Sequence, residues 1–240
     1  MTHAQIAHRR LVQQQVATSK FSQPHELVAW MGAMQAQDYL GSLWAIGARV
    51  PGSTETMIEA AVAEGSIVRS WPMRGTIHWM AAVDVRWMVE LLAPRVIQSS
   101  QGRLRQLGID AATLSASADV LARALQGGKQ LPRPALYEAL EQAGIGAEGQ
   151  RGIHILGQLA MRQLLCIGPR AGKQPTFVLL DEWIPPVQQL GREEALATVA
   201  TRYFTSHGPA TRQDFVHWTG LTIADAKAAI ASVSSQLRCD

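Results

Sequence analysis

Two side-chain amides and a carboxylate fall within four positions of the chain, at Gln35, Gln37 and Asp38. On a continuous helix, residues two apart point in directions about 200° apart, whereas in an extended segment or a turn they face the same way. The two amides can therefore share one site only where the apolar helix that precedes them has ended. The alternative is a solvated polar helix end, with Asp38 capping the next helix.

Glutamine does not titrate, so this pair can orient a water molecule and present dipoles but cannot serve as a strong acid or base. Such help suffices only for a good leaving group. A leaving group that is already cationic departs without acid and leaves a cation for the water to attack. A neutral leaving group would need protonation, and no carboxylic acid has an obvious route to that role. Asp38 could stabilise the cation, but capping is the simpler role for it.

Composition indicates a soluble globular protein, because 47% of the 240 residues are hydrophobic and only 17% are charged. No apolar run reaches the roughly 18 residues of a membrane span, and the N-terminal segment lacks a signal-peptide core. Cys166 and Cys239 are too far apart in sequence for a local metal-ligand pair, and the histidines show no ligand spacing. The sequence therefore predicts a cytoplasmic, reducing location, and neither a metal nor another cofactor.

The formal net charge is only +3, from 22 basic and 19 acidic residues, and all but four of the basic residues are arginine. The guanidinium of arginine binds phosphate through two parallel hydrogen bonds, which lysine cannot do. A GC-rich genome would, however, produce the same excess of arginine without any functional reason. The charge is spread along the chain without a basic tail. Any phosphate-binding surface must therefore be assembled by folding.

The apolar spacing predicts the order of the elements that position the two glutamines. Helices are expected at 4–15, from residue 24 onward, at 40–48 and at 54–63. The spacing of the apolar residues then changes from a helical to a strand pattern. This predicts two strands, at 67–71 and 76–80, joined around residues 72–75. The order recurs with helices at 83–106, 117–125, 132–140 and 151–165, followed by strands at 165–168 and 176–180. Helices followed by one hairpin is the order of a winged helix.

A third unit follows Pro185 and Pro186, with helices at 192–205, 211–218 and 223–234. No hairpin is expected after them, because the chain stops at Asp240 where a third hairpin would begin. We therefore expect a truncated third unit, or one completed by another segment. The predicted fold is mainly α with small β-hairpins (α+β), in tandem winged-helix domains at 1–107, 108–190 and, incomplete, 191–240.

Three motifs carry a resemblance to a known family: Gln-Ala-Gln-Asp-Tyr at 35–39, Arg-Ser-Trp-Pro-Met-Arg-Gly-Thr-Ile-His at 69–78 and His-Gly-Pro-Ala-Thr at 207–211. With its three helix-rich units, the chain resembles the tandem winged-helix DNA glycosylases of the AlkZ type, in the HTH_42 superfamily. The resemblance spans nearly the whole chain, and the Arg-Gly-Thr-Ile-His run at 74–78 is its most specific part.

The resemblance implies DNA binding by winged helices that line a concave surface. It also implies removal of alkylated bases, including crosslinked ones, by a glutamine-aliphatic-glutamine motif, which Gln35-Ala36-Gln37 matches. A purine alkylated at N3 or N7 is already cationic, so its glycosidic bond breaks without acid through a sugar cation, and it fits a pair of amides that only orients water. In a sister branch the second glutamine is aspartate, whereas this chain keeps glutamine. The family normally completes its third winged helix and adds a small β-barrel, and this sequence lacks both. Many members are known only as predicted DNA-binding proteins.

The candidate site residues follow from these arguments. We expect Gln35 and Gln37 to be catalytic. We expect one positively charged surface to bind double-stranded DNA through Arg69, Arg74, Arg170, Lys173, His207 and Arg212, although solvated hairpin charges would give the same residues. The protein is expected to act as a monomer.

Two alternatives to a glycosylase stay open. A non-catalytic regulator would normally dimerise and read base edges with a recognition helix, but 151–165 offers mostly apolar residues. A scaffold that binds proteins would keep the fold and lose the DNA. The glycine-rich run at 144–149 fits a dinucleotide fingerprint, but it follows a helix where a strand is required, so we interpret it as a turn. The tryptophans fall mainly on apolar faces, which favours packing in the core over stacking on bases.

Overall fold

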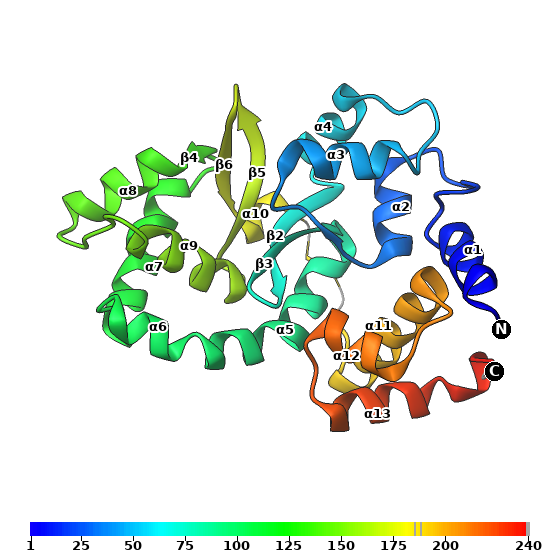
Figure 1. The fold of residues 1–240 in the computed structure, drawn as a ribbon. Coiled ribbons are helices and arrows are strands. Elements are labelled where there is room, and N and C mark those ends of the chain that lie inside the picture. The colour runs from blue at the N-terminus through cyan, green and yellow to red at the C-terminus, as the bar shows by residue number, and fades with distance from the viewer. Residues whose placement is uncertain (185, 188, 239–240) are drawn as a thin grey trace.

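A small antiparallel sheet lies between two groups of helices in the computed structural model of the chain (Figure 1). The structure describes residues 1–184, 186–187 and 189–238, so Pro185, Gln188, Cys239 and Asp240 lie outside it. Every strand pairing among these residues is antiparallel. The expected mainly helical chain with small hairpins is confirmed.

The first half of the chain supplies five short helices, a two-residue strand, a hairpin and the longest of the described helices. Its elements are α1 (His3–Gln13), α2 (Pro24–Met31), β1 (Met34–Gln35), α3 (Tyr39–Gly47), α4 (Glu55–Ala63), β2 (Ile67–Met73), β3 (Thr76–Ala81), α5 (Ala82–Ser99) and α6 (Gln101–Gln106). The single helix expected at 83–106 is two helices that meet at Ser100. The Ser100 hydroxyl donates to the carbonyl of Ile97, and a glycine follows at 102.

The second half repeats helices and a hairpin and then ends in helices. Its elements are α7 (Ala111–Leu125), β4 (Leu131–Pro132), α8 (Arg133–Gln142), α9 (Arg151–Met161), β5 (Leu165–Ala171), β6 (Gln174–Leu179), α10 (Leu180–Trp183), α11 (Arg192–His207), α12 (Arg212–Thr219), α13 (Ile223–Ser232) and a 3-10 turn at Ser234–Gln236. The short strands β1 and β4 and the helix α10 were not predicted. Residues 144–149 follow α8, and Gly144 adopts a positive φ of 76°, so this run is the expected turn.

The two hairpins join into one six-stranded sheet of order β1-β3-β2-β5-β6-β4. The junction pairs Arg69 of β2 with Ile167 of β5, and the two strands run antiparallel. Because the strands run in opposite directions from this pair, the β2–β3 turn and the β5–β6 turn lie at opposite ends of the sheet. At about 3.3 Å per residue, the two turns are on the order of 30 Å apart.

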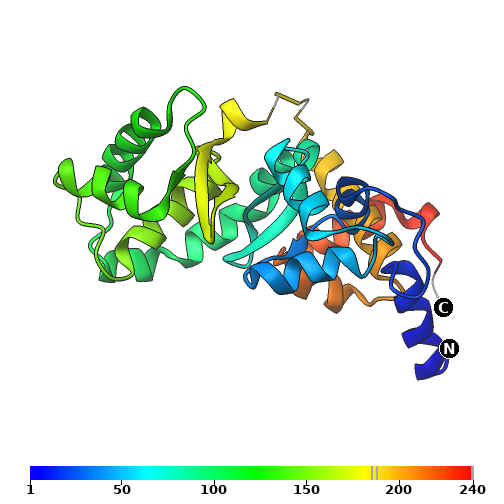
Figure 2. The same cartoon turned by 90° about the horizontal axis from the view of Figure 1, so that it is seen from above.

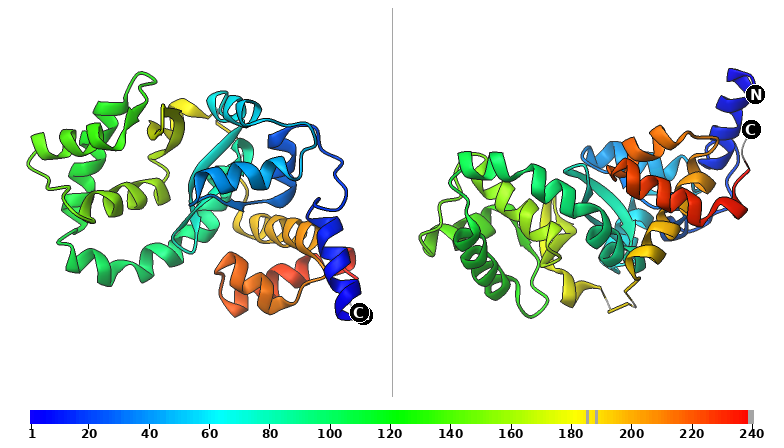
Figure 3. Two further views of the ribbon diagram at one scale, coloured as in Figure 1. Left: turned by 45° about the horizontal axis from the view of Figure 1, so that its top comes forward. Right: turned by 90° about the horizontal axis from the view of Figure 1, so that it is seen from below.

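Buried side chains connect the sheet to both helix groups. The larger cluster includes Val68 and Ile167 from the sheet, Leu156 from α9 and Phe215 from α12, whereas a smaller cluster packs Trp79 under α2, α3 and α4. Seen from above, α6–α9 lie at one end of the molecule and α11–α13 at the other (Figure 2). Both termini lie at the α11–α13 end (Figure 3). Among the described residues, no helix is long and apolar enough to cross a membrane.

Candidate active site

Strand β1 holds the glutamine motif against the hairpin. Met34 pairs with Trp79 and Gln35 pairs with His78, and the Ala36 N–H donates to the carbonyl of Ile77 at 2.8 Å. Side chains alternate along this extended segment, so Met34 and Ala36 are buried while the two glutamines are exposed. The helix before the motif ends at Met31, where Gly32 takes a positive φ of 76°.

The side-chain amides of Gln35 and Gln37 are in contact, which the end of the preceding helix makes possible. Gln35 Nε2 donates to Gln37 Oε1 at 3.0 Å. This bond uses one donor and one acceptor and leaves the Gln35 oxygen and the Gln37 amino group free. A single water molecule could donate to the first and accept from the second. The pair lies on an exposed surface, so substrate and water can reach it together.

Asp38 takes the capping role. Its side chain accepts a hydrogen bond from the backbone N–H of Gly41 at 3.2 Å and so caps the N-terminus of α3. A carboxylate at this position satisfies a free N–H and complements the helix dipole. The helix therefore begins directly after the motif, which fixes the chain on the C-terminal side of Gln37.

His78 supports the motif from the neighbouring strand as a neutral ring. It is 1% exposed, and burial lowers its pKa to about 4. Its Nδ1 lies 3.0 Å from the carbonyl of Thr76, which can only accept, so Nδ1 carries the proton. Its Nε2 can then accept from Arg74 Nη2 at 3.3 Å. His78 thus ties the turn at Arg74 to the strand position opposite Gln35.

Arg69 corrects the expectation of a phosphate contact, because only 6% of it is exposed. Its Nη2 donates to the Ala36 carbonyl at 2.5 Å, and its guanidinium lies over the rings of Tyr39 and Trp79, at 4.9 and 5.2 Å. All seven residues of β2 are buried. A strand covered on both faces leaves an arginine no route to the surface. Sequence reasoning identified this residue but missed its inward direction.

The remaining predicted DNA contacts lie on different elements of the fold. Arg74 is exposed at the β2–β3 turn and lines a pocket of about 210 Å³ with His207. Lys173 is exposed at the β5–β6 turn, at the other end of the sheet. Arg212 is exposed in the first turn of α12. The surface expected for all six residues therefore cannot include the buried Arg69, and the antiparallel junction of the hairpins places Arg74 and Lys173 at opposite ends of the sheet.

His207 shares the Arg74 pocket as a half-buried ring. Burial, aided by the nearby charge of Arg49, lowers its pKa to about 4. The ring is therefore neutral at neutral pH. It can exchange hydrogen bonds with a phosphate or sugar but supplies no positive charge.

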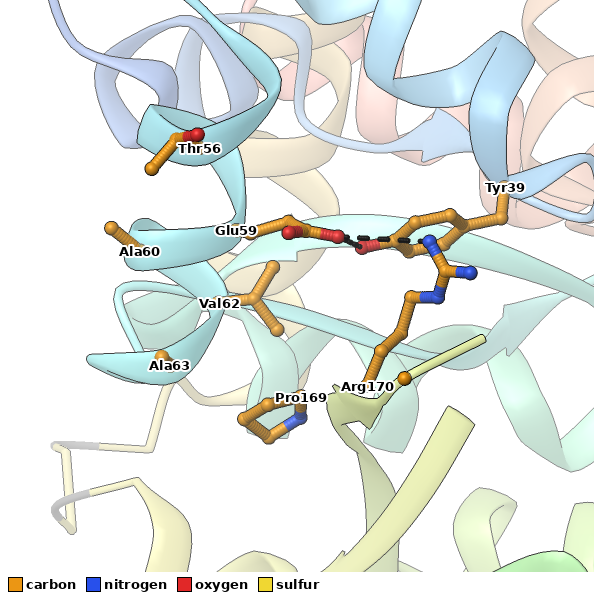
Figure 4. Close-up of a pocket in the computed structure, with 9 residues that line it drawn as sticks. Tyr39, Thr56, Glu59, Ala60, Val62, Ala63, Pro169 and Arg170 are labelled. Atoms are coloured by element: carbon orange, nitrogen blue, oxygen red, sulfur yellow. Dashed lines mark hydrogen bonds and ion pairs between the residues drawn. The ribbon is translucent and has the colours of Figure 1, made fainter. Parts of the chain in front are cut away.

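A second pocket, of about 490 Å³, separates α4 from the β5–β6 hairpin (Figure 4). Tyr39 donates its hydroxyl to Glu59 Oε1 at 3.2 Å, and burial together with the Glu59 charge raises the pKa of Tyr39 to about 12. Arg170 lies over the Tyr39 ring at 4.6 Å and pairs with Glu59 at 3.7 Å. Arg170 is thus engaged within the protein. No local sequence signal connects these three residues.

Other reactive groups are committed to the core. Asp84 is 2% exposed, forms an ion pair with Arg202 and accepts from Trp87 Nε1 at 3.0 Å, so it is not an available acid. Burial raises the pKa of the Cys166 thiol to about 12. Within residues 1–184, 186–187 and 189–238, no cluster of three or more His, Cys, Asp or Glu side chains could hold a metal ion.

Trp79 and Trp87 are buried, but Trp44 is 76% exposed and departs from the expected core packing.

Comparison with known proteins identifies the family of the chain. The chain is 25% identical over 209 residues to an interstrand DNA cross-link repair glycosylase of Streptomyces sahachiroi, which covers 82% of this chain and 54% of that protein. The chain therefore spans about half the length of this relative. The solved structure of Streptomyces sahachiroi DNA glycosylase AlkZ has a similar fold, with a TM-score of 0.78, 21% identity and coverage of 99% of this chain and 67% of that one. The family described as DNA glycosylase AlkZ-like matches residues 28–238, so the chain belongs to the AlkZ-like DNA glycosylase family.

Proposed function

We propose that this protein is a DNA repair glycosylase that hydrolyses the N-glycosidic bond of purines alkylated at N3 or N7 in duplex DNA. The hydrogen-bonded amide pair of Gln35 and Gln37, exposed beside the sheet in a chain of this family, carries the proposal. The pair offers one free acceptor and one free donor for a water molecule. This arrangement suits a substrate whose base leaves without acid catalysis.

In the proposed reaction, the bond between C1′ and the purine nitrogen breaks and its electron pair neutralises the cationic base. The Gln35 oxygen accepts a hydrogen bond from the attacking water, and the Gln37 amino group donates one to the water oxygen. The water oxygen then bonds to C1′ of the sugar cation and loses its proton to solvent. The products are a free alkylated base and an abasic site. Because water rather than an amine attacks, the enzyme is monofunctional.

We also propose that the DNA is held by tandem winged helices. In this interpretation the β2–β3 and β5–β6 hairpins are the wings of units 1–107 and 108–190, and 191–240 contributes a third unit. Exposed Arg74, Lys173 and Arg212 would contact phosphates of one duplex. One monomer would act alone on the lesion.

The exposure of the amide pair bears on the substrate. An enclosed pocket would require the base to be flipped out of the helix, whereas an exposed pair can be reached by a base that is still joined to the opposite strand. We therefore propose interstrand crosslinks among the substrates. The relative from Streptomyces sahachiroi is named for the repair of such crosslinks.

A non-catalytic regulator is less well supported. Helix α9 occupies the place of a recognition helix, but most of its residues are buried, including Gln158, which donates to Ser100 Oγ at 2.9 Å. Few of its side chains are left to read base edges in the major groove.

The proposal is tested by incubating the protein with methylated duplex DNA and measuring the released base. We expect release of N3- or N7-methylpurine and an equal amount of abasic sites. A protein that binds the DNA and releases no base above the uncatalysed rate would be the non-catalytic alternative.

A further inference from the structure

The guanidinium of Arg69 is buried without a carboxylate partner. Among the described residues, no aspartate or glutamate forms an ion pair with Arg69. Its Nε is buried and has no hydrogen-bond partner. Burial is also the main cause that lowers its pKa to about 10. A buried charge without a paired charge lowers the stability of the fold. The contacts of the guanidinium therefore indicate which other role Arg69 has.

Within the part of the chain that the structure describes, the side-chain hydrogen bond of Arg69 goes to the carbonyl of Ala36, the residue between the two glutamines. Arg69 reaches from β2 over the ring of Trp79 on β3 and donates to the Ala36 carbonyl on the far side. The N–H of Ala36 is bonded to Ile77. Both polar backbone groups of the central residue of the motif are therefore fixed, one by β3 and one by Arg69.

This contact controls where Gln37 points. Beyond Gln35 the chain leaves the sheet, so strand pairing no longer orients the peptide between Ala36 and Gln37. The Arg69 bond sets the direction of that carbonyl and, with it, the direction in which the Gln37 side chain leaves the chain. The aromatic rings hold the guanidinium in place through cation–π contacts.

We propose that Arg69 is a positioning residue for catalysis, because its guanidinium fixes the Ala36 carbonyl and so holds Gln37 at hydrogen-bonding distance from Gln35. The role rests on the proposed base-release activity of the amide pair. Arg69 itself touches neither the substrate nor the water.

The test compares Arg69→Met, which keeps an apolar stem and removes the donors, with Arg69→Lys, which keeps a charge and a donor. Arg151→Met is the matched control, since Arg151 also donates to backbone carbonyls, at Gly108 and Gly146, but lies in α9 away from the motif. The measurements are the single-turnover rate of base release from methylated duplex DNA and the Kd for the same DNA. The side-chain amide signals of Gln35 and Gln37 are followed by NMR, with assignment from the single alanine variants.

Arg69→Met is expected to lower the single-turnover rate by about 10-fold or more, the order expected from misplacing a catalytic group. Its Kd should stay within about twofold, because no phosphate contact is lost. The amide signals of Gln35 and Gln37 should move toward those of isolated exposed glutamines. Arg69→Lys should recover part of the rate, and Arg151→Met should change neither the rate nor the signals.

Two results would overturn the role. One is a folded Arg69→Met protein with the wild-type rate and unchanged amide signals. The other is a loss of DNA affinity as large as the loss of rate, which would make Arg69 a phosphate contact. If Arg69→Met does not fold, Arg69→Lys decides instead: a lowered rate of base release with unchanged amide signals would contradict the role. If the wild type releases no base, the proposed function fails, and the amide signals still decide whether Arg69 positions the pair.

Discussion

At the scale of single residues, the candidate site is built from groups that stay uncharged. Gln35 and Gln37 cannot titrate, and His78 beside them is buried as a neutral ring. Asp38 is engaged as a helix cap and Asp84 in an ion pair. The arrangement therefore favours a reaction whose leaving group is already activated, because no described side chain at the motif is placed to donate a proton to the base.

The buried His78 and the half-buried His207 predict how stability depends on pH. Burial lowers the pKa of His78 and of His207 to about 4, whereas histidine in an unfolded chain titrates near pH 6.5. Between these values the unfolded state binds more protons, so the free energy of unfolding is unaffected above about pH 6.5 and falls as the pH drops toward 4. The slope is about 1.4 kcal/mol per pH unit for each histidine.

Urea unfolding between about pH 7 and pH 5 measures this slope. His78→Gln should reduce it by the contribution of one histidine. His25→Gln is the control, because that ring is exposed, and it should keep the wild-type slope. An unchanged slope in His78→Gln would show that His78 is not held neutral by the fold.

At the scale of elements, the β2–β3 turn shows a conflict between folding and function. Met73 pairs with Thr76, so Arg74 and Gly75 form a two-residue turn with φ values of 54° and 70°. Two positive φ values are typical of a type I′ turn, which favours Asn-Gly. An arginine at the first position costs about 1 kcal/mol relative to a residue that tolerates this conformation. Such strain at an exposed basic residue is consistent with a binding role.

Arg74→Asn should therefore raise the free energy of unfolding by about 0.5 to 1 kcal/mol and weaken DNA binding. The salt dependence of binding should fall by roughly one phosphate contact. Gln163→Asn, at another non-glycine residue of positive φ (64°), is the control and should leave DNA binding unchanged. If Arg74→Asn binds DNA as tightly as the wild type, the turn does not contact phosphate.

Much of the element order was predictable from the sequence, because the period of apolar residues changes at 67 and again at 165, where β2 and β5 begin. The strands β1 and β4 have two residues each, too few to show any period. The pairing of β2 with β5 joins hairpins distant in the chain, and no local pattern encodes it. Spacing showed that the two amides can meet only where the helix has ended, and the family resemblance favoured that arrangement. The direction of Arg69 was not predictable, since burial on both faces of β2 depends on that pairing.

At the scale of the whole molecule, the joined hairpins would set the length of the proposed DNA site. The turns at Arg74 and Lys173 lie at opposite ends of one sheet, on the order of 30 Å apart. Base pairs stack about 3.4 Å apart along the duplex, so roughly nine base pairs are needed to span both turns.

On a long duplex, Arg74→Asn and Lys173→Ala should each lower the salt dependence of binding by about one contact, and the double variant by about two, with additive free energies. On a duplex shorter than roughly nine base pairs, the second substitution should add little. Titrations of labelled long and short duplexes at several salt concentrations measure the affinity and its salt dependence. If only one of the two substitutions weakens binding of the long duplex, the DNA does not span the sheet.

The central claim, that the amide pair catalyses base release, is tested most directly by single-turnover measurements on methylated duplex DNA with Gln35→Ala and Gln37→Ala. Each change should lower the rate by about 10²-fold, the order expected for one lost preorganised dipole, and leave the free energy of unfolding within about 0.5 kcal/mol. The Kd for DNA should be unchanged in both variants. The control is Gln13→Ala, at an exposed glutamine of α1, and its Kd should be unchanged as well. A double alanine variant that releases base at the wild-type rate would contradict the assignment.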